Sequence, residues 1–159
     1  MKVSVGCDHG ALALKNKVVS HLQGKGVEVI DFGTPTLDSC DYPEFAAAAA
    51  RAVASGECEK GIVLCTTGIG VSISANKIDG IRCALLSDVW SAKMTRLHND
   101  TNMMALGAGV VGENLALEIV DTCCPPNSPA MSAISAASTR SWPWRADPFC
   151  IDSRETGRK

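Results

Sequence analysis

Short apolar runs separated by longer segments with helical periodicity make up the first 122 residues of the chain. Each run is five or six residues long and rich in aliphatic residues, which is typical of β-strands. The run over 61–65 is apolar throughout, as expected of a central strand covered on both faces. Strands that alternate with helices predict a parallel sheet with crossover connections. The five predicted strands are residues 3–7, 27–32, 61–65, 81–86 and 103–107.

Amphipathic or capped segments between these runs predict the crossover helices. The first helix has one apolar face, and Pro43 and Gly56 frame an alanine-rich second helix. Two shorter helices are predicted over 71–77 and 113–122, and another begins at Ser87 or Asp88. The predicted apolar face of the first helix carries Ala11, Leu14, Val18 and Leu22, and that of the helix after Asp88 carries Trp90, Met94 and Leu97.

Charge and hydropathy argue against two classes of partner. Fifteen Lys and Arg against 17 Asp and Glu give a net charge of -2, so the chain lacks the basic surface that nucleic acid or anionic lipid requires. The N-terminus reaches Asp8 too early for the apolar run of a signal peptide, and no later run approaches about 18 apolar residues. We therefore expect a cytoplasmic protein without a nucleic acid or membrane partner.

Composition changes abruptly near residue 122. Thirteen of the 14 glycines precede Thr122, whereas five of the seven prolines and two of the three tryptophans follow it. We predict one domain over 1–122 and an atypical tail over 123–159 that is rich in Ser, Pro, Arg and Trp and has no sustained periodicity. Within the tail, Trp142-Pro143-Trp144 is either a docking element for a partner or part of a loosely packed terminus.

The eight cysteines favour reduced thiols over disulfides or a metal site. Cys7, Cys65 and Cys83 lie in or at the end of apolar runs, where buried free cysteines are common. The chain has no C-x-x-C spacing and only three histidines. We predict no metal centre.

Polar residues follow several of the predicted strands. In an open parallel sheet, ligands bind beyond the carboxyl ends of the strands, so these residues are the candidates for a site. They are Asp8 and His9 after the first strand, Cys65, Thr66 and Thr67 after the third, and Ser87 and Asp88 after the fourth.

The turn Gly68-Ile69-Gly70 connects a strand to a helix. Backbone N–H groups and the positive end of the helix dipole converge at such a turn, which predicts an anion site. Ile73 stands where the dinucleotide-binding pattern needs its third glycine, and the Gly-Lys-Ser/Thr of a P-loop is absent. A tight structural turn remains the alternative interpretation.

Cys65 is the strongest catalytic candidate, because a thiol between a strand end and a helix N-terminus is an environment that favours the thiolate. A thiolate base beside an oxyanion cradle suits proton abstraction next to a carbonyl. Acyl transfer by a Cys–His pair competes with this interpretation, although no Asn or Asp is evident to orient a histidine at Cys65. His9 and His98 taken singly are as compatible with structural roles.

Six segments carry a specific pattern. They are Asp8-His9-Gly10, Asp41-Tyr42-Pro43, Cys65-Thr66-Thr67-Gly68-Ile69-Gly70, Ser72-Ile73-Ser74-Ala75-Asn76-Lys77, Gly80-Ile81-Arg82 and His98-Asn99-Asp100-Thr101-Asn102. Together they resemble the family of type B ribose-5-phosphate isomerases and galactose-6-phosphate isomerases. The resemblance implies an α/β fold, a three-layer Rossmann-like sandwich with a five-stranded parallel sheet. It also implies a homodimer or tetramer with shared active sites, and aldose–ketose isomerisation of a sugar phosphate without a cofactor.

The same resemblance assigns roles by position. Cys65 corresponds to the base that moves a proton between C2 and C1, and the amides of 66–70 correspond to the cradle for the enediolate. Ring opening falls to Thr67, Asp8 and His98, with His98 and Asn99 supplied by the facing subunit. The remaining predicted substrate contacts, or supports of such contacts, are His9 for the phosphate and Tyr42, Ser72 and Asn76 for the sugar.

Three departures from the family pattern concern the cradle and the phosphate. Thr66 stands where the family usually has glycine, and Gly109 stands where it usually has an arginine that contacts phosphate. The family also ends in a helix with a Gly-Arg-His-Gln-x-Arg-like motif, which this sequence lacks. We hypothesise that the tail is a shifted reading frame, because residues 132–139 can be decoded in the neighbouring frame as Val-Gly-His-Gln-Arg-Arg-Val-Asp. Resequencing the gene tests this hypothesis.

Two functions therefore remain in competition. The first is an active isomerase, most simply one that converts ribose 5-phosphate to ribulose 5-phosphate, which the intact set Cys65, Thr67, Asp8 and His98 favours. The second is a catalytically weak sugar-phosphate-binding or pairing subunit of the same fold, which Gly109 and the altered tail favour.

Overall fold

A computed structural model describes residues 1–125. The tryptophan-containing segment 142–144 and the reading-frame hypothesis for 132–139 lie outside the described residues. The predicted domain boundary falls inside the last helix, which continues through Cys123, and the side chains of Cys123 and Cys124 are buried in the core.

Five parallel strands form one sheet in the order β2-β1-β3-β5-β4. The central strands are buried along nearly their whole length, whereas the two edge strands are only partly buried. The bounds are β1 Lys2–Cys7, β2 Glu28–Asp31, β3 Lys60–Cys65, β4 Cys83–Leu85 and β5 Met103–Gly107.

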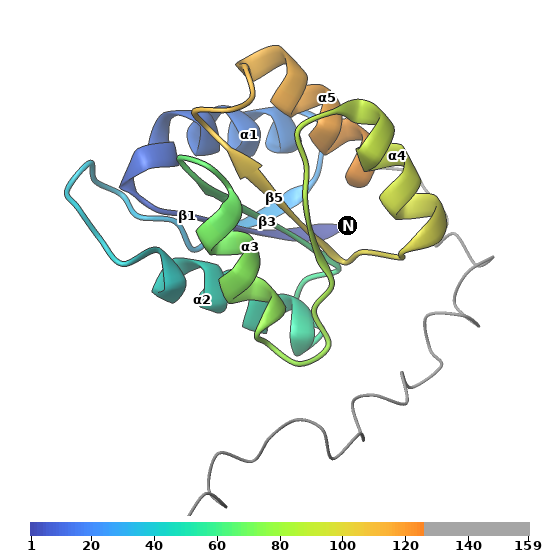
Figure 1. The fold of residues 1–159 in the computed structure, drawn as a ribbon, viewed down its shortest axis with the longest axis horizontal. Coiled ribbons are helices and arrows are strands. Elements are labelled where there is room, and N and C mark those ends of the chain that lie inside the picture. The colour runs from blue at the N-terminus through green and yellow to red at the C-terminus, as the bar shows by residue number, and fades with distance from the viewer. Residues whose placement is uncertain (126–159) are drawn as a thin grey trace, which may run out of the picture.

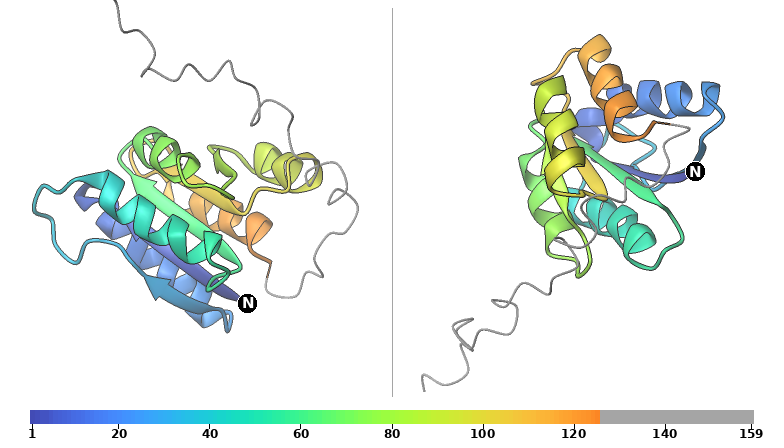
Figure 2. Two further views of the ribbon diagram at one scale, coloured as in Figure 1. Left: turned by 90° about the horizontal axis from the view of Figure 1, so that it is seen from below. Right: turned by 90° about the vertical axis from the view of Figure 1, so that its right-hand side faces the viewer.

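Helices cover both faces of the sheet and produce the three-layer α/β sandwich that the family resemblance implied (Figure 1). One face packs against α1 and α5, with α4 beside α5, and the other packs against α2 and α3. Figure 2 shows the layers from two further directions. The bounds are α1 Leu12–Gly24, preceded by the short η1 His9–Ala11, α2 Tyr42–Ala54, α3 Ile69–Asn76, α4 Val89–His98 and α5 Glu113–Cys123.

The predicted strands and the first helix are largely confirmed. The fifth strand has the predicted bounds, and all four residues of the predicted apolar face of α1 are buried. The fourth strand is shorter than predicted, because the backbone N–H of Arg82 donates to the side chain of Asn102 (2.8 Å) instead of joining the ladder. Within residues 1–125, no helix is long and apolar enough to cross a membrane.

The predicted apolar face of α4 is wrong. Trp90 is 68% exposed, whereas Ala92 and Thr95 are buried. The helix lies beside α5 at the edge of the sheet, so its small residues make the close contact and its largest side chain remains outside. Asp88 accepts a hydrogen bond from the backbone N–H of Ser91 (2.7 Å), which confirms it as the cap of the helix and lowers its pKa.

A buried lysine anchors the loop that follows β2. The side chain of Lys15 is 5% exposed, and its ammonium lies 2.5 Å from Asp31 Oδ2. The other carboxylate oxygen accepts a hydrogen bond from the backbone N–H of Gly33 (2.8 Å). The backbone N–H of Thr34 donates to the carbonyl of Cys7 (3.1 Å), so the loop is held against the end of β1.

Replacing Leu64 by Ala tests whether the central strand carries the core. Leu64 is fully buried in β3, so truncation should leave a cavity and cost about 2–5 kcal/mol of unfolding free energy. Leu37→Ala is the matched control, because Leu37 is 76% exposed and its truncation should change stability by less than about 0.5 kcal/mol. Urea unfolding followed by circular dichroism measures both variants, and equal costs would contradict the assigned core.

Candidate active site

The carboxyl ends of β1 and β3 lie side by side where the chain departs to opposite faces of the sheet. After β1 the chain enters α1 on one face, and after β3 it enters α3 on the other (Figure 1). The backbone N–H of Asp8 donates to the carbonyl of Leu64 (3.2 Å), so Asp8 lies directly beside Cys65. Such a divergence point is where open α/β sheets bind ligands.

The thiol of Cys65 accepts a hydrogen bond from the backbone N–H of Gly68, with a nitrogen–sulfur distance of 3.0 Å. Cys65 as a whole is only 6% exposed. The contact fixes the sulfur beside the turn that follows β3. Burial raises the pKa of Cys7 to about 11 and that of Cys124 to about 12, so both thiols are protonated at neutral pH. The prediction that Cys7 is a buried free thiol is confirmed.

The turn after β3 requires glycine. Gly68 has φ +77°, and a Cβ at this position would lie 2.6 Å from Leu85 Cδ1 and 2.9 Å from the carbonyl carbon of Leu106. The helix begins at Ile69, two residues earlier than predicted. The amides of its first turn have no acceptor within the helix, and that of Ile69 donates instead to Thr67 Oγ1 (3.3 Å). The turn is therefore tight, as the interpretation of a structural turn predicts. It also begins a helix, as the interpretation of an anion site requires.

The loop after β5 braces this turn from the opposite side. The backbone N–H of Ala108 donates to the carbonyl of Cys65 (2.9 Å), and that of Gly109 donates to the carbonyl of Thr66 (2.8 Å). A Cβ on Gly109 would lie 3.2 Å from the same Thr66 oxygen. The position where the family usually carries an arginine thus adjoins the predicted cradle, although glycine offers no side chain there.

Asp8 and His9 have defined local partners. The carboxylate of Asp8 caps η1 by accepting the backbone N–H of Gly10 (3.0 Å) and is mostly buried. His9 Nδ1 accepts the backbone N–H of Cys40 (3.3 Å). A neutral ring that accepts this amide at Nδ1 carries its proton on Nε2. The Cys40 contact could not be predicted from the sequence, because it depends on how the long loop after β2 folds back.

Tyr42 and Thr66 close the remaining sides of the turn. The Tyr42 ring lies so near Gly70 that a Cβ there would be 2.8 Å from two ring carbons. The hydroxyl of Thr66 occupies the space where a side chain on Gly10 would be. These contacts bring the start of α2 and the loop after β1 against the predicted cradle.

Three of the predicted site side chains are engaged in local hydrogen bonds. Thr67 Oγ1 accepts the backbone N–H of Ile69 (3.3 Å), and the Ser72 hydroxyl donates to the carbonyl of Ile69 (2.8 Å). The amide of Asn76 donates to the carbonyls of Ser72 (2.9 Å) and Cys83 (2.8 Å) and accepts the N–H of Cys83 (2.9 Å). Asn76 thereby ties α3 to the edge strand β4, which is the geometry of a support.

His98 and Asn99 lie at the opposite edge of the sheet. His98 is the last residue of α4, which runs antiparallel to the strands, and β5 begins five residues later at Met103 (Figure 1). The five residues of β5 then lead back to the edge that carries Cys65, a distance of about 13 Å at about 3.3 Å per residue. Asn76 also lies away from Cys65, because its amide binds the backbone of Cys83, which pairs with Met103 at the start of β5. One chain therefore brings together the predicted site residues other than Asn76, His98 and Asn99.

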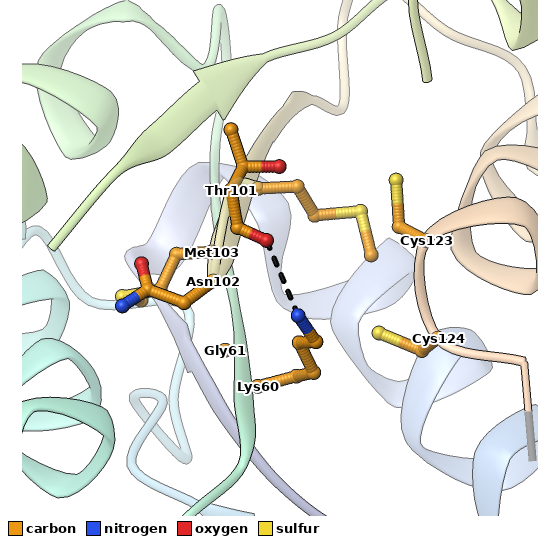
Figure 3. Close-up of a pocket in the computed structure, with 8 residues that line it drawn as sticks. Lys60, Gly61, Thr101, Asn102, Met103, Cys123 and Cys124 are labelled. Atoms are coloured by element: carbon orange, nitrogen blue, oxygen red, sulfur yellow. Dashed lines mark hydrogen bonds between the residues drawn. The ribbon is translucent and has the colours of Figure 1, made fainter. Parts of the chain in front are cut away.

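A shallow cavity lies at this same opposite edge and is not the candidate site (Figure 3). It encloses about 170 Å³, including space open to solvent. The Lys60 ammonium donates to the carbonyl of Thr101 (3.3 Å), and burial lowers its pKa, while burial raises the pKa of Cys123 to about 11. None of the predicted site residues lines it.

Comparisons with known proteins cover nearly all of the described residues. The profile of the family described as Ribose/Galactose Isomerase matches residues 3–125. Ribose-5-phosphate isomerase B of Escherichia coli is 51% identical over 120 residues, which are 76% of this chain and 80% of that protein. The LacB subunit of galactose-6-phosphate isomerase from Clostridium acetobutylicum is 44% identical over 121 residues, 76% of this chain and 70% of that one. The structure of Clostridium thermocellum ribose-5-phosphate isomerase B superimposes with a TM-score of 0.80 at 47% identity, covering 87% of this chain and 93% of that chain.

Gly68→Ala tests the constraint on the turn. We expect a loss of stability well above the roughly 1 kcal/mol cost of a positive φ, because the added Cβ also clashes with Leu85 and Leu106. Gly56→Ala is the matched control, since Gly56 has φ +82° but nothing within 4 Å of the added Cβ. Thermal unfolding of the two variants measures the difference, and a Gly68→Ala protein as stable as Gly56→Ala would contradict the crowded turn.

Proposed function

Because the chain belongs to the Ribose/Galactose Isomerase family, we propose that it interconverts an aldose phosphate and its ketose, with ribose 5-phosphate and ribulose 5-phosphate as the preferred pair. The observation that carries the proposal is the hydrogen bond from the Gly68 amide to the Cys65 thiol, beside a helix N-terminus. It joins a candidate base to a group of amide donors. The similarity to named isomerases favours this proposal over the catalytically weak subunit.

The proposed chemistry is a proton transfer through an enediolate. The Cys65 thiolate takes the proton from C2 of the open-chain aldose, and the amides of 66–70 stabilise the negative oxygen that develops. The thiol returns the proton to C1, while O1 gains a proton and O2 loses one as the ketone forms. No electron leaves the substrate, so the proposal requires no cofactor.

Substrate binding and ring opening are assigned to the surrounding groups. His9 donates from Nε2 to the phosphate, an orientation supported by the Cys40 amide on its Nδ1. Asp8 and Thr67 adjoin the cradle and act on the ring oxygen and anomeric hydroxyl with His98. Tyr42 contacts the sugar, and Ser72 and Asn76 hold α3 in place.

We propose that a second copy of the chain supplies His98 and Asn99. The two residues lie at the far edge of their own sheet, and both are exposed at the end of α4. Four large apolar side chains near the cradle edge are also exposed, as is common at sites of association. They are Ile69, Ile73, Leu85 and Val110. A homodimer, or a tetramer built from it, in the cytoplasm is the assembly that we propose.

The reading-frame hypothesis for 123–159 also remains a proposal. The family profile ends at residue 125, close to the position where composition changes. Gly109 leaves the cradle without the arginine that the family usually has, so this chain would bind phosphate with fewer charge-assisted contacts than its relatives. Each such contact contributes about 1.5–3 kcal/mol.

Cys65→Ser tests the base. A serine hydroxyl keeps the shape but ionises far above neutral pH, so turnover should fall by about 10²–10⁴-fold while substrate affinity changes little. Steady-state assays with ribose 5-phosphate and galactose 6-phosphate measure kcat and KM, and they also identify the preferred sugar in the parent protein. A Cys65→Ser enzyme with near-normal kcat would exclude this residue as the base, and a parent protein inactive on all sugar phosphates would favour the weak-subunit alternative.

Mixing two inactive variants tests the shared site. If His98 acts across an interface, Cys65→Ala and His98→Asn chains should form hybrid dimers in which one of the two sites is intact. Random exchange should restore about a quarter of the parent activity. Exchange is verified by mass spectrometry of the intact assembly, and no recovery after verified exchange would show that each site is built within one chain.

A further inference from the structure

The turn after α4 has a backbone conformation that needs support from outside. His98 ends the helix, Asn99 closes it, and Asp100 follows with φ +45°. In residues 1–125, Asp100 is the non-glycine residue with a positive φ. Such a residue is strained and persists where its surroundings hold it in place.

The guanidinium of Arg82 forms several hydrogen bonds to this turn. Its Nη2 donates to the Asp100 carbonyl (2.6 Å) and lies 2.8 Å from the Asp100 carboxylate. Its Nε donates to the carbonyls of Asp100 (3.1 Å) and Asn99 (3.2 Å). One planar group thus binds two consecutive carbonyls and a carboxylate, an arrangement that the ammonium of lysine cannot reproduce.

The backbone of Arg82 is itself fixed to the sheet. Its N–H donates to Asn102 Oδ1 (2.8 Å), and its carbonyl accepts the N–H of Met103 (3.2 Å). The amide of Asn102 donates in turn to the carbonyl of Gly80 (2.8 Å). The segments 80–82 and 99–102, in which the family resemblance assigned a role to Asn99 alone, therefore form one clasp anchored where β4 and β5 begin.

Resting on the proposed shared site, we propose that Arg82 is a positioning residue for the neighbouring subunit's reaction. By holding the Asn99–Asp100 turn, it presents His98 and Asn99 in the orientation that reaches the Cys65 of a second copy. The hydrogen bonds of Arg82 join it to Asn99, Asp100, Asn102 and Met103, at the edge of the sheet opposite Cys65. Loss of Arg82 should therefore impair the active site to which its own chain contributes His98, and not the site to which it contributes Cys65.

Subunit mixing separates this role from a general structural one. We expect Arg82→Gln to lower kcat by about 10–100-fold, the penalty for a misplaced catalytic group. In a hybrid with Cys65→Ala, the Arg82→Gln chain supplies an intact Cys65 to one site. The Cys65→Ala chain supplies an intact Arg82 and His98 to the same site, so activity should return. In a hybrid with His98→Asn, both sites remain damaged, so activity should stay low.

The control is Arg51→Gln, which removes an exposed arginine of α2 on the other face of the sheet and should leave kcat unchanged. Arg82→Lys keeps the charge without the planar fork and should lower kcat in the same hybrid pattern, so it replaces Arg82→Gln if that variant does not fold. The proposal is overturned if His98→Asn restores activity to Cys65→Ala but Arg82→Gln does not. Complementation of His98→Asn by Arg82→Gln also overturns it.

Amide hydrogen exchange distinguishes failure of the clasp from failure of the shared site. In Arg82→Gln, the amides of 99–102 should exchange at least about tenfold faster, since their local opening is no longer opposed by the guanidinium. Unchanged exchange overturns the clasp whatever the activity. Faster exchange combined with no complementation between Cys65→Ala and His98→Asn identifies the shared site as the part that fails, whereas a parent protein inactive on all sugar phosphates identifies the proposed function.

Discussion

The candidate site depends on one hydrogen bond, from the backbone N–H of Gly68 to the thiol of Cys65. This contact requires a left-handed backbone at residue 68, and the space beside it is filled by Leu85 and Leu106, so only glycine satisfies both conditions. The same turn starts α3, whose first amides have no acceptor within the helix. Bracing by the loop after β5 then fixes the carbonyls of Cys65 and Thr66. The position of the sulfur and the donor array beside it therefore have a common structural origin.

Sheet topology decides which groups can join this turn. The chain leaves β1 and β3 toward opposite faces, which places Asp8 and His9 beside Cys65 without any long loop. A helix that returns antiparallel to its strand must end at the other edge, and α4 accordingly leaves His98 and Asn99 far from the Cys65 of their own chain. Rigid presentation of these two residues at an exposed edge is the role that the Arg82 clasp would serve in a shared site.

Periodicity and strand composition predicted the sheet. The central strands are buried along nearly their whole length, and α1 buries one regular apolar face, so both leave a clear pattern in the sequence. The predicted face of α4 was wrong, since the helix packs on α5 rather than over the sheet and uses Ala92 and Thr95 for that contact. Candidate residues at strand ends could be predicted from topology alone. The Cys40 contact to His9 and the hydrogen bonds of Arg82 could not, because each joins segments whose relative placement is set by the folded core.

Exchange of solvent hydrogen into the sugar tests the central claim most directly. If Cys65 carries a proton between C2 and C1 through an enediolate, the parent protein in D2O should introduce deuterium at C2 of the recovered aldose phosphate. Cys65→Ser should abolish that exchange while the phosphate-binding surface stays intact. NMR of the recovered sugar measures the label. Deuterium that enters C2 at the parent rate in Cys65→Ser would contradict the assignment of this thiol as the base.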